Sequence, residues 1–134
     1  MSDLHNSIHL APALNTSAIT SSTTTNGNII DMQGYGAVEF AIQSATLTDG
    51  TYTPLIQEGS AANLSDATTV AAADLHGTTA SATFALTDDN VVKKIGYVGS
   101  KRYVRLSIVS TSVTTGGTIS ALAIQGRAHD LPVS

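Results

Sequence analysis

The chain has 134 residues and a formal net charge of −4, with no cysteine, 4% aromatic residues and 12% charged residues. This length allows one compact domain, and the lack of cysteine excludes disulfides, thiolate metal sites and cysteine nucleophiles. The negative charge argues against binding nucleic acid through phosphate contacts. Ser and Thr together number 34. Because Thr is β-branched and suits pleated sheet better than exposed helix, this composition predicts an all-β domain.

The first 27 residues differ from the rest of the chain. Residues 16–27 are a polar stretch of low complexity, and the N-terminus has neither the basic nor the apolar segment of a signal peptide. No run approaches the roughly 20 apolar residues that span a bilayer, so no membrane partner is expected. We predict an N-terminal arm over residues 1–27 and a β-sandwich domain over residues 28–134. The arm is expected to contact a partner through its apolar side chains, which are Leu4, Ile8, Leu10 and Leu14.

After the arm, short apolar runs alternate with turn signals roughly every 8 to 15 residues, the spacing of an antiparallel β-sandwich. Several runs alternate apolar and polar residues, as half-buried strands do. The pattern predicts about eight strands. They are expected at residues 28–32, 37–43, 52–57, 69–73, 80–87, 92–98, 102–110 and 119–127.

Two turns and one strand are distinctive. Thr48–Thr51 contains Asp-Gly, which takes the positive φ angles of a hairpin turn, and Thr115–Thr118 contains a glycine pair that predicts a second tight turn. Pro54 cannot donate to a sheet ladder, so its strand is expected at an edge or a bulge. Residues 119–124 are apolar on both faces. This predicts an interior strand or a contact surface and, through Leu122, self-association, with a dimer favoured over a trimer.

Charge is divided along the sequence. Residues 1–90 contain nine acidic residues and no Lys or Arg, whereas residues 91–134 contain all six Lys and Arg residues and one acid. Such a division favours ion pairs between parts of one domain or between two proteins. The basic residues expected at such a contact are Lys101, Arg102 and Arg105.

Few residues are arranged for catalysis or metal binding. Glu39 and Glu58 are the only glutamates, no serine lies in G-x-S-x-G, and no glycine-rich loop ends in Lys-Ser or Lys-Thr. His5 and His9 have helical i, i+4 spacing but no third ligand nearby, and residues 88–90 lack the order of an EF-hand. We therefore expect a structural or binding protein without catalytic residues, cofactor or metal.

Three phrases resemble small structural proteins of tailed bacteriophages. They are residues 38–43 (VEFAIQ), 46–59 (TLTDGTYTPLIQEG) and 95–106 (IGYVGSKRYVRL). The likeness extends over roughly residues 29–128 and consists of phrase order, turns and strand-like segments rather than a catalytic motif. In phage genomes such proteins are encoded close to the major capsid protein, and characterised relatives by fold are capsid cement or decoration proteins.

The resemblance implies a jelly-roll β-sandwich that binds the major capsid protein on the outside of the capsid and stabilises it. The protein would be assembled in the host bacterial cytoplasm and reside on the virion surface. The alternative is a carbohydrate-binding or fibre-type β-sandwich module of a phage virion. Such a module usually displays solvent-facing Trp or Tyr for sugar stacking, whereas this chain has no Trp and four scattered Tyr.

Overall fold

The structure is a computed structural model, which describes residues 8–128. The described part contains nine strands, close to the expected eight, and one 3-10 turn, η1 (Ala72–Asp74). The strands are β1 (His9–Ile19), β2 (Thr24–Asp31), β3 (Tyr35–Leu47), β4 (Thr51–Gly59), β5 (Thr68–Thr69), β6 (Leu75–His76), β7 (Val92–Tyr97), β8 (Tyr103–Thr111) and β9 (Gly117–Ala128). The predicted all-β class is confirmed.

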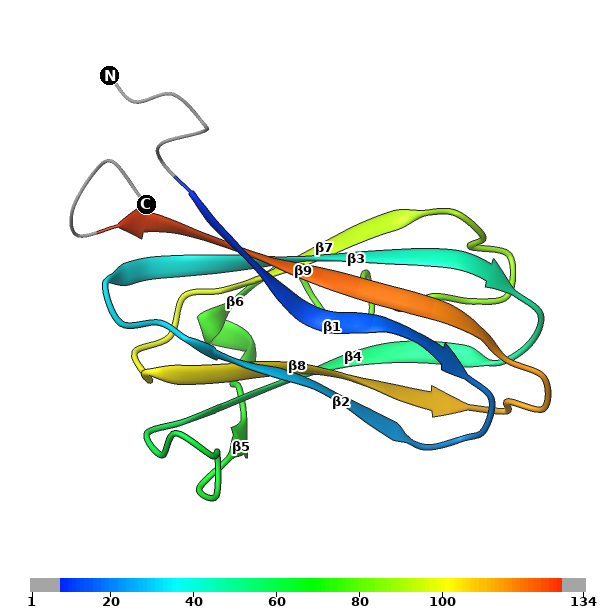
Figure 1. Cartoon of the computed structure of the whole chain (residues 1–134), viewed down its shortest axis with the longest axis horizontal. Helices are drawn as coiled ribbons and strands as arrows, with labels where there is room; N and C mark the ends of the chain where they lie inside the picture. Colours follow the sequence, from blue (N-terminus) through cyan, green and yellow to red (C-terminus); the bar gives the residue numbers. More distant parts are fainter. Residues whose placement is uncertain (1–7, 129–134) are drawn as a thin grey trace.

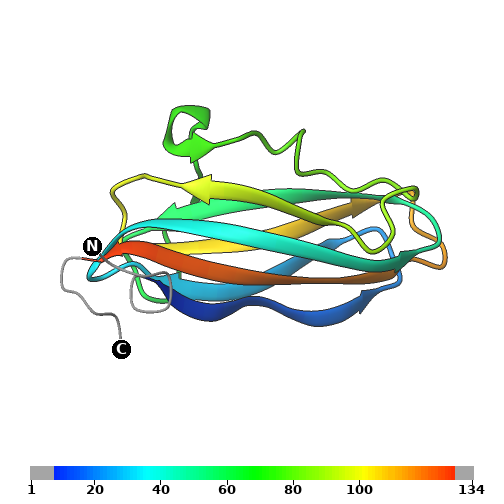
Figure 2. The same ribbon diagram turned by 90° about the horizontal axis from the view of Figure 1, so that it is seen from above.

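The strands form two antiparallel sheets that lie face to face (Figures 1 and 2). Sheet A has the order β1-β9-β3-β7-β6, and sheet B has the order β2-β8-β4-β5. The pairs β1–β9, β2–β8, β3–β7 and β4–β5 are nested, as if one long hairpin were wound into two sheets. This connectivity defines a jelly roll, which agrees with the predicted antiparallel sandwich.

The core lies between the sheets and is built by alternating residues. On β3, Val38, Phe40 and Ile42 are buried while Glu39 and Gln43 face outward. Other strands follow the same period of two. Further buried side chains are Tyr52 and Ile56 on β4, Ile95 on β7, Leu106 and Ile108 on β8, and Ile119 and Ala123 on β9. Full burial of each large apolar side chain stabilises the fold by about 1.5–3 kcal/mol.

Two side-chain hydrogen bonds cross the core from one sheet to the other. Tyr97 on β7 donates its hydroxyl to Glu58 Oε1 on β4 at 2.6 Å. Burial, together with this bond, raises the pKa of Tyr97 well above its ordinary value. On β9, the buried Gln125 donates from Nε2 to the carbonyl oxygen of Asp31 on β2 at 2.9 Å. Both bonds link sheet A to sheet B.

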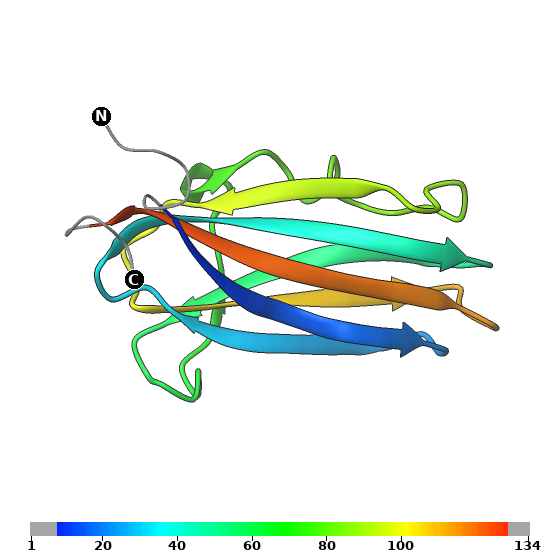
Figure 3. The ribbon, with the colours of Figure 1, turned by 45° about the horizontal axis from the view of Figure 1, so that its top comes forward.

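The predicted boundary between an arm and a sandwich is wrong for the described part of residues 1–27. Residues 9–19 form the edge strand β1, which pairs with β9, and β2 begins at Thr24 (Figures 1 and 3). A bulge after Pro12 brings Ala13 and Leu14 into the core together. The low complexity of this segment suggested disorder, but its Thr residues are β-branched and also suit an edge strand.

Gly27 shows how closely this segment is built into the sandwich. A Cβ at this position would lie 2.2 Å from the Leu106 carbonyl oxygen and 2.3 Å from that of Ala13. Only glycine allows β2 to approach β8 and β1 this closely. The next residue, Asn28, donates from Nδ2 to the carbonyl oxygen of Pro12 at 2.9 Å. Residues 9–28 therefore belong to the folded core structure.

The Asp-Gly turn is real, but its predicted role as a hairpin is wrong. Gly50 has a φ of 91°, yet the turn connects β3 in sheet A to β4 in sheet B. The second predicted turn likewise crosses between sheets, from β8 to β9, with Gly116 at a φ of 89°. A glycine with positive φ can occur in any tight turn. The residue types alone therefore do not distinguish a hairpin within one sheet from a corner, which is a turn that connects the two sheets.

The two corners are tied together by one carboxylate. Asp49 accepts backbone N–H bonds from Thr114 at 3.2 Å, Thr115 at 3.0 Å and Gly116 at 2.8 Å. The N–H groups of Thr115 and Gly116 lower the pKa of Asp49, because they stabilise the charged carboxylate. This arrangement fixes the right-hand end of the sandwich in Figure 1.

The segment between β6 and β7 also departs from expectation. Residues 80–87 were expected to form a strand with Ala82, Phe84 and Leu86 inward. Ala82 and Phe84 are fully buried, but the segment makes one isolated bridge, Tyr52 to Phe84, and Leu86 is 53% exposed. The chain turns away after Phe84, so the period of two ends there.

The weak strand expected over residues 69–73 is reduced to β5 and η1.

Pro54 lies where the sequence predicts it. It is paired with Ile108 of β8, and the side of β4 away from β8 has only short partners, the bridge at Tyr52 and the two residues of β5. Because no long strand pairs with β4 on that side, the missing N–H of Pro54 removes no hydrogen bond between long strands.

Candidate interaction surfaces

The outer face of sheet A carries an apolar band. It is defined by Leu10 and Pro12 on β1, Leu122 on β9, Ala41 on β3 and Val92 on β7. Adjacent strands align these residues, since Pro12 is opposite Leu122 and Leu122 is opposite Ala41. Leu10 is 53%, Leu122 41% and Val92 61% exposed. A depression of about 430 Å³ overlaps the band between β1, β9, β3 and β7, and its lining also includes polar residues, which are Asn15, Thr16, Gln43 and Ser120.

A second surface lies at the end of the sandwich where β2 turns into β3 and β7 into β8, on the left in Figure 1. Residues 32–36 and 99–102 line a depression of about 440 Å³ there. Arg102 forms a bidentate pair with Asp31 at 3.0 Å for both contacts and donates to Gln33 at 2.7 Å. Lys101 is exposed and forms no ion pair within residues 8–128. We name this surface the basic end.

Sheet B presents a different outer face. Arg105 on β8 donates from one terminal nitrogen to Gln57 Oε1 at 2.8 Å, while its Nε is buried without a hydrogen-bond partner among the described residues. Ser107, also on β8, is fully buried and donates to Asn26 Oδ1 at 3.1 Å. Neighbouring side chains of the same sheet thus bind these two polar groups, while Ile29 of β2, opposite Arg105, is 36% exposed on the same face.

The predicted contact residues fall into separate places. Leu10 and Leu122 are brought together in the apolar band, and Lys101 and Arg102 in the basic end. Arg105 is separate from both, on the outer face of sheet B. Ile8 is half-buried, whereas Leu14 is buried in the core and offers no contact surface. Leu4 lies outside the described residues.

Sequence reasoning missed three members of the apolar band, Pro12, Ala41 and Val92. Their apolar chain neighbours gave no sign that these side chains face outward, and only the pairing of strands distant in sequence places them together. A signal was present for Ala41, because it replaces the polar residue expected between Glu39 and Gln43 on the outer side of β3.

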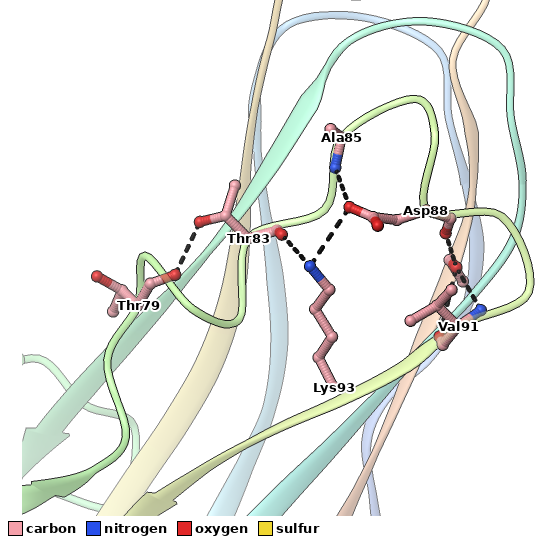
Figure 4. A network of polar contacts seen from close by, with 7 residues as sticks. Thr79, Thr83, Ala85, Asp88, Val91 and Lys93 are labelled. Atoms are coloured by element: carbon pink, nitrogen blue, oxygen red, sulfur yellow. Dashed lines mark hydrogen bonds and ion pairs between the residues drawn. The ribbon is translucent and has the colours of Figure 1, made fainter.

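Lys93 also has a role that the sequence did not reveal. Its ammonium group donates to the Thr83 carbonyl oxygen at 2.7 Å and pairs with Asp88 Oδ2 at 3.3 Å (Figure 4). It also lies 5.2 Å from the centre of the Phe84 ring. Asp88 in turn accepts the N–H of Ala85, and this bond leads the causes that lower the pKa of Asp88. Lys93 therefore fastens residues 83–88 to β7 and is unavailable to a partner.

A third depression, of about 470 Å³, is lined by Glu39, His76, Ser81 and two lysines. Ser81 donates its hydroxyl to the Thr78 carbonyl oxygen at 2.9 Å. No hydrogen bond joins Ser81 to His76 within the described chain, so the groove holds no paired nucleophile and base. Across residues 8–128 no three His, Asp or Glu side chains gather as a metal site, and no helix has the length and apolarity to cross a membrane.

The fold and its surfaces define a jelly-roll β-sandwich with two exposed candidate contact regions. Comparison with protein-family models and with curated proteins finds no match for this chain. Among solved structures, the chain is similar to PBSX exported protein XepA, with a TM-score of 0.61 and 20% identity over 100% of this chain. The chain spans 41% of the length of XepA. The likeness to XepA shows the fold.

A second solved structure, SPBc2 prophage-derived protein YomS, aligns with a TM-score of 0.48 and 10% identity. The alignment covers 87% of this chain and 92% of YomS.

Proposed function

We propose that this chain is a structural protein of a bacteriophage particle, which binds the outside of the capsid and stabilises it as a decoration protein. The fold is similar to that of PBSX exported protein XepA, and the sequence resembles small structural proteins of tailed phages. A stable jelly roll that needs no disulfide or cofactor suits a protein assembled in the bacterial cytoplasm and later exposed outside the cell.

The basic end is the surface through which the capsid contact is made in this proposal. The observation that carries it is the exposed Lys101 beside a depression formed by two loops at one tip of the sandwich. Loops on a rigid sandwich present side chains to a partner without disturbing the core. Arg102 is already paired with Asp31, so Lys101 supplies the charge that an acidic capsid surface would attract.

The test is co-sedimentation of the purified chain with capsids assembled from the major capsid protein of the same phage genome. Saturable binding is expected, with Lys101→Glu weakening it about 3- to 10-fold at low salt and less at high salt. Thr87→Glu adds a negative charge to an exposed loop outside both candidate contact regions and serves as the matched control. No binding of the unchanged chain, or equal loss in both variants, would contradict the proposal.

The carbohydrate-binding alternative has little support among the tyrosines. Tyr52 and Tyr97 are buried, and their hydroxyls are hydrogen-bonded inside the protein. Arg102 lies 5.0 Å from the centre of the Tyr103 ring, and His9 stacks on Tyr35 at 5.8 Å. A neighbouring side chain therefore already occupies one face of each partly exposed ring, which leaves less ring surface for a sugar to stack on.

A further inference from the structure

We propose that the outer face of sheet A binds a second copy of this chain through two-fold symmetry, with Leu122 near the axis. This inference concerns self-association and is independent of the capsid contact at the basic end. Three features of the described residues carry it: the apolar band, the interrupted sheet edges and a pair of opposite charges beside the band.

The apolar band is large enough for a weak dimer. Four strands at about 4.8 Å spacing and roughly 20 Å along them give about 400 Å² of flat surface per chain, in which Ser120, Gln43 and Lys94 lie among the apolar side chains. Single exposed apolar residues are ordinary on a protein surface, but several gathered on one sheet face often mark a contact. Two such faces bury roughly 800 Å², below the standard interface of about 1,600 Å², so we expect micromolar rather than nanomolar affinity.

Growth through the long sheet edges is disfavoured by the structure of β1 and β2. Pro12 and two register shifts interrupt β1, the long edge of sheet A, and a register shift between Asn26 and Ile29 interrupts β2, the long edge of sheet B. Bulges and proline prevent edge strands from pairing with another chain. A second copy therefore meets a more continuous surface on the face of sheet A than along either edge.

Opposite charges make this face complementary to itself. Glu39 on β3 and Lys94 on β7 both lie on the outer side, and neither forms an ion pair within residues 8–128. They are diagonal neighbours, because Glu39 is opposite Gly96 and Lys94 is opposite Ala41. The two residues occupy the β3–β7 side of the apolar band.

Symmetry then relates the charges to the band. Consider a two-fold axis that lies in the contact plane and crosses the line from Glu39 to Lys94 at its midpoint and at a right angle. With ordinary strand spacing, this axis passes close to Leu122. Such an axis places Glu39 against the partner's Lys94 twice and Leu122 against the partner's Leu122. Isologous contacts of this kind are the commonest form of homodimer.

The first experiment measures mass by sedimentation equilibrium from about 1 to about 200 µM, the range suited to a small interface. We expect the mass to rise with concentration from 13.7 kDa to twice that value. Leu122→Lys should weaken the association at least about 10-fold, because it places a charge in the apolar contact. Leu86→Lys is the matched control, since Leu86 is 53% exposed on a loop away from the band.

A mass that stays at 13.7 kDa throughout, or one that rises to a trimer or larger ring, would overturn the proposal. Equal association of Leu122→Lys and the unchanged chain would also overturn it. Thermal midpoints of both lysine variants establish that they are folded, and Val92→Lys provides a second disruption of the band should Leu122→Lys fail to fold.

The second experiment exchanges the charges. Glu39→Lys and Lys94→Glu should each weaken the dimer, because each places like charges together across the axis. The double variant Glu39→Lys/Lys94→Glu should regain the association. An equimolar mixture of the two single variants should form mixed dimers, since both contacts are then complementary. If the double variant and the mixture associate no better than the single variants, the placement of the axis is wrong.

Discussion

The outer faces of the two sheets differ, although both sheets contribute alternating apolar residues to the same core. On sheet B, polar side chains cover one another, as Arg105 does with Gln57 and Ser107 with Asn26. On sheet A, Leu10, Leu122 and other apolar residues lie exposed. Sheet B exposes one large apolar side chain on this face, Ile29 at 36%, whereas sheet A exposes Leu10, Leu122 and Val92 at 53%, 41% and 61%. This difference is why we propose sheet A rather than sheet B as the face for a second copy.

The most severe way to break sheet A is to remove β1. A chain that begins at Asn28 loses its edge strand and the buried side chains Leu14 and Ile19, each worth about 2–5 kcal/mol against a total stability of about 5–15 kcal/mol. We expect no cooperative unfolding transition by circular dichroism. Within the intact chain, Leu14→Ala should destabilise by about 2–5 kcal/mol and Leu10→Ala by under about 0.5 kcal/mol. A truncated chain with near-native stability would restore the interpretation of an arm.

A single methyl group should disturb the junction between the sheets. Gly27→Ala places a Cβ against two backbone carbonyl oxygens, so we expect a loss of about 1–3 kcal/mol or more in urea unfolding. Gly126→Ala on β9 is the matched control, because nothing lies within 4 Å of the added Cβ. Equal stability of the two variants would mean that β1, β2 and β8 can separate at Gly27 without loss.

Acid should loosen the corners that join the sheets. The N–H groups of Thr115 and Gly116 lower the pKa of Asp49 in the folded protein. The contribution of Asp49 to folding stability is therefore present above about pH 4 and is lost as the pH falls through the folded-state pKa. We expect Asp49→Asn to lower the urea midpoint at pH 7 and to flatten its decline between about pH 5 and 2. If the urea midpoint of Asp49→Asn declined with pH as it does in the unchanged chain, the hydrogen bonds of Asp49 to residues 114–116 would not stabilise the two corners.

The Asp31–Arg102 ion pair at the basic end should stabilise the fold less than the hydrogen bonds of Asp49 do. Its side chains are 45% and 48% exposed, so it contributes little to stability and weakens with salt. The side-chain hydrogen bond from Arg102 lowers the pKa of Asp31, which therefore also loses its contribution as the pH falls. Arg102→Gln should change the urea midpoint slightly in low salt and not at all in about 1 M salt. A loss that persists in high salt would show a structural role beyond charge.

The smallest effect is expected on the outer face of sheet B. Arg105→Met removes a buried Nε that has no hydrogen-bond partner among the described residues and keeps an apolar stem of similar length, so stability should change by under about 1 kcal/mol. Self-association should be unchanged, whereas Lys94→Met on sheet A should weaken it. Loss of the dimer in Arg105→Met would reverse the assignment of the two faces.

Local patterns predicted the strands that alternate strictly. Phe40 and Ile42 on β3, and Leu106 and Ile108 on β8, are buried as their period of two indicates. The same rule failed at Leu86, because the backbone leaves the sheet after the single bridge at Phe84. Periodicity identifies the inward side of a segment only while the segment remains a strand.

The candidate surfaces were predicted only in part. Leu122 was expected on a contact strand and is exposed, and Lys101 and Arg102 lie at one tip of the sandwich. Leu14 was expected to contact a partner but is buried in the core, because the bulge after Pro12 reverses the side of β1 that its neighbours indicate. A bulge depends on the partner strand, which for Leu14 is more than 100 residues away at Ala121.

The sequence by itself determined the all-β class, the inward residues of the regular strands, the tight turns at Gly50 and Gly116 and the freedom from disulfides. These follow from local geometry and residue chemistry. The tertiary structure alone decided that both turns join different sheets, that residues 9–27 belong to the sandwich and that Leu10 lies beside Ile124 and Pro12 beside Leu122. These depend on strand pairing across most of the chain, because a backbone N–H or C=O can be satisfied by many partners and only the complete jelly roll selects one.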